Sequence, residues 1–233
     1  MVELKHATVL VTGANGGLGT EFVNQALALG ASKVYAAARN PREWGDERIV
    51  PLRLDVTDEE SIAAAVRQAP DVDVVINNAG TLLPGKLLDQ PISGIRSLMD
   101  TNVYGPLLVT KAFAPVLAAR GGGAVLNVHS VLSWLAIGGS YSVSKAALWM
   151  TTNVLRLELA SQGTQVTGLH LGYTDTPMVA AVDAEKNDPA DVVRDAYAGL
   201  GSGATEVLAD DVSVAVKAGL AGPIEALYPQ VAG

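Results

Sequence analysis

The sequence contains no cysteine and only three histidines, and these shortages exclude several kinds of chemistry. Without cysteine there can be no disulfide, no thiolate nucleophile, no iron–sulfur cluster and no cysteine-ligated zinc. The histidines, at positions 6, 129 and 170, lack the clustered spacing of a metal site. We therefore expect chemistry that does not depend on a metal.

Basic residues are also scarce, and they do not form a run. Lysine and arginine together number 16, against 24 aspartates and glutamates, which gives a net charge of −8. Nucleic-acid binding depends on a basic surface, so this acidic chain is a poor candidate for that function. A hydrophobic content of 49% argues against disorder.

One uncharged segment raises the question of a membrane span. The 24 residues between Arg120 and Lys145 carry no formal charge, but they include glycines, five serines, Asn127 and His129. A spanning helix needs about 20 mainly apolar residues, so we expect a buried strand and site loops here instead. Early polar residues such as Glu3 interrupt any secretory leader, and we expect a cytoplasmic protein.

Short β-rich runs alternate with helical patterns along most of the chain. The patterns predict strands at 7–11, 33–38, 49–54, 72–76, 124–128 and 165–169, and helices at 18–29, 57–69, 95–117 and 141–160. Nearly continuous apolar strands that alternate with helices indicate a parallel sheet covered on both faces. At 233 residues the chain has the length of one large α/β domain. We therefore expect a single, doubly wound domain over 1–233.

Local signals refine two of these helices. Thr57 and Glu60 have the spacing of a capping box, which would begin the second helix. Pro106 and Pro115 fall inside the predicted 95–117 helix and predict a bend or a break there. The region 183–211 differs again, with eight acidic and two basic residues. It is either a solvated excursion from the sheet or a flap over a pocket, and we expect a substrate flap at about 177–211.

A glycine-rich loop follows the first predicted strand and begins the first helix. Gly13, Gly17 and Gly19 have the spacing T-G-x-x-x-G-x-G, with Asn15 and Leu18 between them. Glycine lets a phosphate approach the backbone, and a helix N-terminus offers free N–H groups to an anion. The loop is not a Walker loop, because no Gly-Lys-Ser/Thr follows. A nucleotide site is the best interpretation of this strand–loop–helix context.

The end of the second strand should select the cofactor. A carboxylate there would bind a ribose 2′-hydroxyl, but the sequence has Arg39 and Asn40 instead. A guanidinium suits a 2′-phosphate, so we predict NADP(H) rather than NAD(H). The alternative is an ordinary surface arginine.

Two further strand ends carry polar residues that could serve the same nucleotide. Asp55 could accept a hydrogen bond from an adenine amino group, with Val56 packed on the ring, or it could simply cap the following helix. Asn78, Ala79 and Gly80 follow the fourth strand, where an asparagine can tie strand ends together and small residues let a ring lie close.

A tyrosine and a lysine form the candidate catalytic pair. Tyr141 and Lys145 are four residues apart on a predicted helix, so both side chains project from one face. Ser130 lies beside a strand end, eleven residues upstream of the tyrosine. A neighbouring ammonium and an oxidised nicotinamide ring would lower the phenol pKa from about 10 and make the tyrosine a general acid or base near neutral pH.

Taken together and in this order, these motifs resemble the short-chain dehydrogenase/reductase family from the first strand to Met178. The resemblance implies a Rossmann fold and a catalytic tetrad. Asn102 would hold a water that relays protons, Ser130 would bind the substrate oxygen, and Tyr141 would transfer the proton. Lys145 would lower the tyrosine pKa and bind the nicotinamide ribose. The family pattern also implies that Gly172, Thr174 and Thr176 cover the nicotinamide end.

The resemblance further implies a homodimer or homotetramer, built on the helices near 95–117 and 141–160. His129 stands where the family often has a second serine. Its side chain should point away from Ser130, because alternate residues of a strand face opposite sides, so we expect a packed histidine. The candidate pocket residues are Trp134, Leu135, Ile137, Trp149 and Met178, although ordinary packing is favoured for Trp149.

The sequence therefore predicts reversible hydride transfer between NADP(H) and a ketone or aldehyde and its alcohol. Two alternatives stay open. One is an NADP-binding sensor or scaffold without turnover, which would have no need of Tyr141 and Lys145 together. The other is a ketoreductase for carrier-linked substrates, which the acidic region at 183–211 disfavours.

Overall fold

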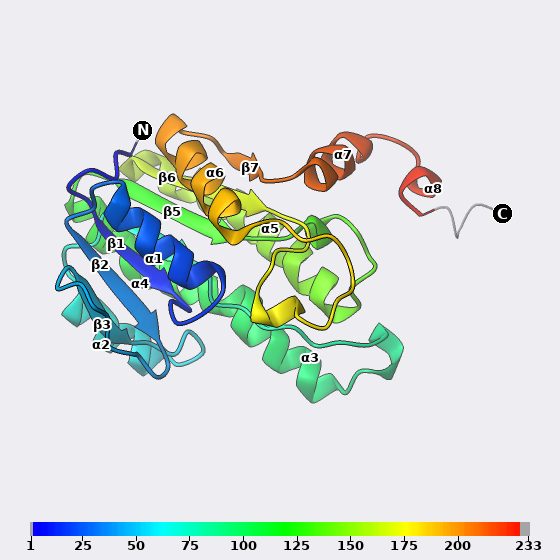
Figure 1. The fold of residues 1–233 in the computed structure, drawn as a ribbon, viewed down its shortest axis with the longest axis horizontal. Helices are drawn as coiled ribbons and strands as arrows, with labels where there is room; N and C mark the ends of the chain where they lie inside the picture. Colours follow the sequence, from blue (N-terminus) through cyan, green and yellow to red (C-terminus); the bar gives the residue numbers. More distant parts are fainter. Residues whose placement is uncertain (1, 229–233) are drawn as a thin grey trace.

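Aliphatic and β-branched segments form a seven-stranded parallel sheet in the computed structural model, which describes residues 2–228 (Figure 1). The strands are β1 (Thr8–Thr12), β2 (Lys33–Ala38), β3 (Ile49–Arg53), β4 (Val74–Asn77), β5 (Gly123–Val128), β6 (Thr164–His170) and β7 (Glu206–Leu208). Every residue of β1 and β4 is buried, because helices cover both faces of the sheet.

The helices divide between the two faces. One face packs against α1 (Leu18–Ala28) and α6 (Pro189–Ser202), and the other packs against α2 (Glu59–Gln68), α4 (Gly105–Ala119) and α5 (Ser140–Leu159). On the first face, the ring centroids of Phe22 and Tyr197 lie 5.5 Å apart in an edge-to-face arrangement. The Tyr197 hydroxyl also donates to the carbonyl of Phe22 at 2.8 Å. These contacts join α6 to α1 and hold both helices against the sheet.

The strand order places the site. The order is β3-β2-β1-β4-β5-β6-β7, so the chain moves outward from β1 to β3 and then returns to the other side of β1. The carboxyl ends of β1 and β4 flank this switch point, where open α/β sheets bind their ligands. The glycine loop, Asn78 and the catalytic candidates all follow strands that end at this edge.

The doubly wound fold and the six predicted strands are confirmed, with bounds that shift by one or two residues. The prediction that 183–211 is a solvated excursion or a flap over the pocket is wrong over most of this region. Residues 189–202 form α6, whose Val192, Val193 and Leu200 are buried in the core, and β7 extends the sheet. Of the eight acidic residues only Asp191 and Asp195 lie within α6, and most of the others lie in the segments that flank it. Their number made the whole region look solvated and hid the buried face of this amphipathic helix.

The 95–117 prediction is also corrected. The region contains α3 (Ile92–Met99), a π-helical turn over Asp100–Tyr104, and α4. The break falls before Pro106, which lacks an N–H and is suited to the first turn of α4, whereas α4 continues through Pro115. The capping box at Thr57 is wrong as well, because the side chain of Asp58 accepts from the N–H of Glu60 and caps α2.

A buried row of polar side chains connects β4 and β5 to α5. The Asn77 amide donates to Asn127 at 2.8 Å, and the Asn127 amide donates to the Thr152 hydroxyl at 2.8 Å. That hydroxyl lies 3.0 Å from Nε2 of His129, and the His129 ring stacks on His170 at 4.7 Å. His129 is therefore a packed histidine, as predicted.

The chain continues past the sheet into α7 (Asp211–Gly219) and α8 (Ile224–Leu227), which lie beyond β7 (Figure 1). Within residues 2–228, none of the helices is both long and apolar enough to cross a membrane.

Candidate active site

A cleft of about 1280 Å³ runs along the carboxyl edge of the sheet and brings most of the predicted site residues together. The predicted residues that line it are Gly13, Asn15, Gly17, Leu18, Arg39, Asp55, Val56, Asn78, Ala79, Gly80, Ser130, Tyr141, Lys145, Gly172, Thr174 and Thr176. Two predicted residues, Gly19 and Asn102, are absent from the lining and lie behind it.

The glycine loop is shaped by close backbone contacts. Gly13 and Gly17 have φ values of 65° and 50°, in the left-handed region that glycine tolerates. A Cβ added at Gly19 would lie 2.1 Å from the carbonyl oxygen of Gly13, so only glycine fits there. Gly19 therefore lets α1 begin directly beneath the loop, and its role is packing rather than lining.

The end of β4 is tied to this loop by side chains. The Asn78 amide donates to the carbonyl oxygens of Thr12 and Gly13, at 3.0 and 3.2 Å. The Thr12 hydroxyl accepts from the N–H groups of Asn78 and Ala79, each at 3.0 Å. The prediction that an asparagine joins adjacent strand ends is confirmed, and Thr12 completes the same junction.

Arg39 and Asn40 follow β2 and line the far end of the cleft. The Asn15 amide donates to the carbonyl of Asn40 at 2.7 Å, which joins the glycine loop to this strand end. Arg42, a second guanidinium three residues later, stacks over Trp44 at 4.1 Å and is absent from the lining. Arg39 is thus the only arginine that lines the cleft among residues 2–228.

Asp55 forms a local turn as well as lining the cleft. Its carboxylate accepts from the N–H of Thr57 at 3.0 Å and from the Thr57 hydroxyl at 2.7 Å. These hydrogen bonds hold the Asp55 pKa below its usual value. Because Asp58 is the true cap of α2, the alternative that Asp55 caps the helix is wrong.

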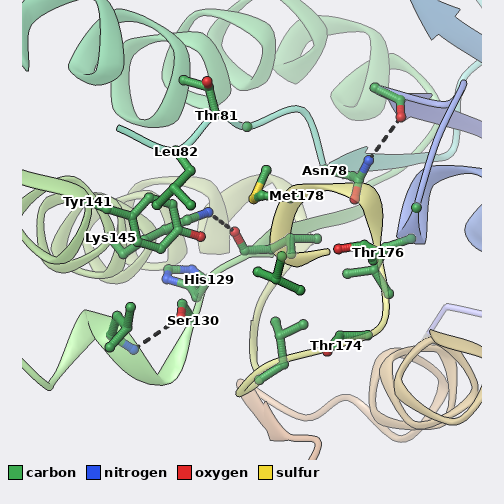
Figure 2. A pocket seen from close by; sticks show the side chains of 18 of the residues that line it. Asn78, Thr81, Leu82, His129, Ser130, Tyr141, Lys145, Thr174, Thr176 and Met178 are labelled. Carbon is green, nitrogen blue, oxygen red and sulfur yellow. Dashed lines mark hydrogen bonds between the residues drawn. The ribbon is translucent and has the colours of Figure 1, made fainter. Parts of the chain in front are cut away.

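Tyr141 and Lys145 begin α5 and face the cleft beside Ser130 (Figure 2). The Lys145 ammonium lies 5.7 Å from the centre of the tyrosine ring and donates to the carbonyl of Val128 at 2.7 Å. The Ser130 hydroxyl accepts from the N–H of Leu132 at 3.1 Å. Since that bond uses the oxygen as acceptor, the hydroxyl proton can point to a second group in the cleft.

The predicted effect of the lysine on the tyrosine is not seen in the protein alone. Burial raises the pKa of Tyr141, because a phenolate loses its hydration there. Burial lowers the pKa of Lys145 to about 8 for the same reason. The ammonium is directed at Val128 rather than at the phenol oxygen, so desolvation outweighs its attraction. Tyr141 is therefore fully protonated at neutral pH and is a proton donor in this state.

Asn102 lies in the π-helical turn, and its side chain makes three hydrogen bonds. It accepts from the N–H of Thr81 at 2.8 Å and donates to the carbonyl of Thr81 and to the Ser144 hydroxyl. A Cβ added at Gly80 would lie 3.5 Å from Asn102 Oδ1 and 4.0 Å from Lys145 Nζ, so these three groups meet. Asn102 thus fixes the strand end on which Lys145 packs.

The loop after β6 crosses back over the glycine loop. A Cβ added at Gly17 would lie 3.1 Å from Cγ2 of Thr176, so the two loops touch. Thr174 is buried, and its hydroxyl donates weakly to the Gly172 carbonyl at 3.4 Å. The 172–176 segment therefore closes one side of the cleft, next to the catalytic pair.

Sequence reasoning missed Asp210, which anchors this loop. Its carboxylate accepts from the N–H of Gly172 at 2.5 Å, from the Asn187 amide at 2.8 Å, and from the N–H of Ser213 at 2.7 Å. No local pattern could have indicated this role, because Asp210 and Gly172 are 38 residues apart.

The pocket predictions are confirmed only in part. Leu135, Ile137 and Met178 line the cleft, but Trp134 and Trp149 are absent from its lining. Trp134 stacks on His170 at 3.9 Å behind the serine loop, and Trp149 donates to Glu206 at 2.7 Å. The wall also contains aliphatic residues that sequence reasoning missed, namely Leu82, Leu83, Pro84, Leu132, Val179, Val182 and Val212.

The residues present fit a dinucleotide. Gly13 and Gly17 leave backbone bare at the start of α1, and a Cβ added at Gly16 would meet nothing within 4 Å. This open, positively polarised helix N-terminus suits a diphosphate. Ala79 and Gly80 line the cleft between the glycine loop and Lys145, and their small size leaves room there for the rest of a dinucleotide.

Comparison with known proteins agrees with this geometry. A family model described as short chain dehydrogenase matches residues 7–187. The chain belongs to the short-chain dehydrogenase family. This confirms the resemblance found in the sequence, and the match extends past the predicted motifs to Asn187, which binds Asp210.

Relatives in sequence and structure share the fold over nearly the whole chain. An uncharacterized oxidoreductase of Staphylococcus aureus is 30% identical over 210 residues, which are 83% of this chain and 90% of that protein. The ketoacyl reductase HetN of Nostoc is 29% identical and covers 89% of this chain and 80% of its own. A Burkholderia cenocepacia short chain dehydrogenase, solved in complex with NADP, is 33% identical with a TM-score of 0.93 and full coverage of both chains.

The close approach at Gly19 gives a first prediction for this short-chain dehydrogenase. Gly19→Ala should lower the free energy of unfolding by several kcal/mol, because its Cβ would overlap the Gly13 carbonyl. Gly16→Ala is the matched control, since its Cβ meets nothing and its stability should be unchanged or slightly higher. Urea unfolding without nucleotide measures both, and equal stabilities would contradict this role for Gly19.

The buried lysine gives a second prediction. Lowering the Lys145 pKa from 10.5 to about 8 costs about 3 kcal/mol of stability at neutral pH. Lys145→Met removes that cost but loses the hydrogen bond to Val128, worth about 1 kcal/mol. The variant should therefore be more stable by about 2 kcal/mol.

The pH dependence of this effect identifies its cause. The gain from Lys145→Met should be complete below pH 8, shrink between pH 8 and 10.5, and vanish above pH 10.5, where the lysine is neutral in both states. Lys5→Met, at an exposed position, should leave stability unchanged at every pH. A gain that does not vary with pH would show that packing, rather than charge burial, is responsible.

Proposed function

We propose that this protein is an NADP(H)-dependent oxidoreductase that reversibly reduces a ketone or aldehyde to an alcohol. The observation that carries the proposal is the single cleft in which Ser130, Tyr141 and Lys145 face the glycine loop. Family membership supports the reaction class. The NADP complex of the Burkholderia relative supports the cofactor, and the identity of the Nostoc relative as a ketoacyl reductase supports the carbonyl chemistry.

The proposed roles follow from the protonation states. The glycine loop and Lys145 would hold a nicotinamide cofactor in the cleft, and that cofactor would supply the hydride for the carbonyl carbon. Ser130 and Tyr141 are hydroxyl donors in one cleft, and they hold the substrate oxygen as negative charge develops on it. Tyr141, protonated at neutral pH, then gives its proton to that oxygen.

The lysine and asparagine support this proton transfer. Lys145 carries a positive charge below pH 8, which stabilises the phenolate left on Tyr141. Asn102 places Gly80 and Lys145 against each other through its bonds to Thr81 and Ser144. We further propose that a water beside Asn102 returns the proton.

Removing the tyrosine hydroxyl tests this mechanism. Tyr141→Phe should reduce kcat by roughly 10²–10⁴-fold, the usual contribution of a positioned general acid, and leave the Kd for NADPH unchanged. Tyr173→Phe is the matched control, because Tyr173 also lines the cleft and has no assigned proton transfer. Kinetics with a carbonyl substrate and a separate NADPH titration give the two values. Near-normal turnover by Tyr141→Phe would show that Tyr141 is not the proton donor.

Arg39 supports the proposed preference for NADP(H). It lines the cleft at the end of β2, where no carboxylate is available for a ribose 2′-hydroxyl. A guanidinium binds a phosphate through two charge-assisted hydrogen bonds. The NADP-bound Burkholderia relative supports the same choice.

Reversing this charge should change the cofactor preference. Arg39→Asp should lower the ratio of kcat/KM for NADPH to that for NADH by at least tenfold, because a carboxylate repels a 2′-phosphate and accepts from a hydroxyl. Arg67→Asp, on the exposed side of α2, controls for the change in net charge. An unchanged ratio in Arg39→Asp would place the 2′-phosphate elsewhere.

We also propose that the protein forms a homo-oligomer through α5. Val143, Met150, Val154 and Leu157 are all exposed on this helix, and Leu157 is 80% exposed. Their spacing of three, four and seven residues places them along one face. An exposed apolar stripe of this kind is typical of a protein–protein contact.

A charge in this stripe should separate the subunits. Leu157→Glu should convert an oligomer into a monomer in light scattering, since a carboxylate would be desolvated at the contact. Leu88→Glu is the matched control, because Leu88 is 97% exposed and lies outside α5. A Leu157→Glu variant with the mass of the unaltered protein would exclude this face.

A further inference from the structure

The wall of the cleft around Ser130 and Tyr141 is aliphatic, and this points to the class of substrate. Resting on the proposed function, we propose that the substrate is an uncharged carbonyl compound with a bulky apolar substituent. The aliphatic wall, defined as Leu82, Leu83, Leu135, Ile137, Met178 and Val212, would bind that substituent.

The aliphatic wall comes from separate parts of the chain that converge on the catalytic pair. Leu82 and Leu83 follow β4, Leu135 and Ile137 lie between β5 and α5, and Met178 follows β6. Figure 2 shows Leu82 and Met178 in the pocket that also holds Tyr141 and Lys145. A group attached to a carbonyl at Tyr141 would therefore meet hydrocarbon from several sides.

Several of these side chains are exposed to solvent although they surround a catalytic site. Ile137 is 67% exposed, Met178 is 45% exposed and Leu82 is 37% exposed. Apolar side chains gathered at the rim of a cleft mark a surface that binds an apolar ligand. Covering them removes hydrocarbon from water, which is favourable by about 25 cal/mol per Å².

The loop that carries Leu135 and Ile137 is held in place by hydrogen bonds to its backbone. The Ser142 hydroxyl donates to the Leu135 carbonyl at 2.6 Å and accepts from the N–H of Gly138 at 3.0 Å. The Tyr228 hydroxyl accepts from the N–H of Ala136 at 2.9 Å and donates to the Trp134 carbonyl at 3.1 Å. With its backbone fixed at four points, the loop presents its apolar side chains to the cleft before any substrate arrives.

The charges in the cleft disfavour an anionic substrate. The lysines and arginines that line it within residues 2–228 are Arg39, Lys145 and Lys186. Arg39 follows β2, three strand positions from β5 and therefore about 14 Å from the catalytic serine's strand. Lys145 is buried on the Val128 carbonyl. Lys186 lines the cleft between Glu185 and Asn187, so its neighbour in the sequence is a carboxylate that also lines the cleft.

Acidic residues strengthen this argument. Asp210 and Asp211 also line the cleft, and the chain as a whole carries a net charge of −8. These carboxylates disfavour a substrate carboxylate or the phosphate of a carrier arm, and Lys186 is the one lysine beside them in the cleft lining of residues 2–228 that is not buried. A polyhydroxylated substrate would leave hydroxyls unpaired against the aliphatic wall, which costs binding energy.

A homologous series of ketones tests the substrate class. We expect kcat/KM for unbranched 2-ketones to rise about threefold for each methylene added, until the aliphatic wall is covered. Keto acids of equal length, polyhydroxy ketones and a β-ketoacyl thioester should all be at least tenfold poorer. If a charged or hydroxylated compound is preferred, or if chain length has no effect, the substrate class is wrong and the reductase function stands.

Binding of inert analogues gives a second measurement that needs no turnover. Primary amides of the same chain lengths should bind the NADP⁺-loaded protein with a Kd that falls as the chain grows, measured by calorimetry. If amides bind in this way but no carbonyl is reduced and no alcohol is oxidised, the proposed function fails and the apolar site remains. If amide binding ignores chain length, the apolar site itself is excluded.

A substitution in the aliphatic wall tests whether this wall causes the dependence of kcat/KM on chain length. Ile137→Thr should reduce kcat/KM for the longest ketone at least fivefold and change it little for the shortest, with NADPH binding preserved. Ile92→Thr is the matched control, because Ile92 is 61% exposed and is absent from the cleft lining. Equal effects of the two variants, or equal losses for short and long ketones, would overturn the role of the wall.

Discussion

The structure depends on one close contact, between the glycine loop after β1 and the end of β4. Gly19 and Gly13 approach too closely for any side chain, and Asn78 and Thr12 bind the two strand ends together. The junction lies between two halves of the sheet. Arg39 follows β2 in the half that contains β1 to β3, and Tyr141 follows β5 in the half that contains β4 to β7. Backbone packing thereby fixes the distance between the glycine loop and the Tyr141 end of the cleft. The proposed hydride transfer would require such a fixed distance between cofactor and substrate.

The catalytic end shows a conflict between stability and function. Lys145 and Tyr141 are both buried. Burial favours the neutral form of each group, so it raises the pKa of Tyr141 and lowers the pKa of Lys145. The Val128 carbonyl accepts a hydrogen bond from the Lys145 ammonium, which offsets part of the cost of burying it. In the proposed function the protonated phenol gives its proton to a developing oxyanion, and the cost in stability would then have a chemical use.

Much of the fold follows from the sequence, because strands buried on both faces are continuous apolar runs that contrast with the helices between them. β7 was missed because a three-residue strand leaves no periodic signal. α6 was missed because acidic residues, most of them in the segments that flank the helix, dominated the composition of the region. The capping residue of α2 was misplaced by one position, since Thr57 and Asp58 are both good caps and only the bond from Thr57 to Asp55 decides between them.

The site residues show the same division. Residues within contiguous motifs, such as Gly13 and Lys145, could be placed in the cleft because each motif follows a strand that ends at the same edge. Trp134 and Asp210 could not, because a loop tryptophan can face the cleft or the core, and a contact across 38 residues leaves no local pattern.

We propose that hydride passes between a nicotinamide and a carbonyl carbon held at Tyr141. The most direct measurement follows deuterium from NADPH labelled at C4, on each face in turn, into the alcohol formed from a long-chain ketone. We expect one of the two labelled forms to place a single deuterium on the carbinol carbon, as seen by mass spectrometry. An alcohol formed without deuterium from either form would contradict it.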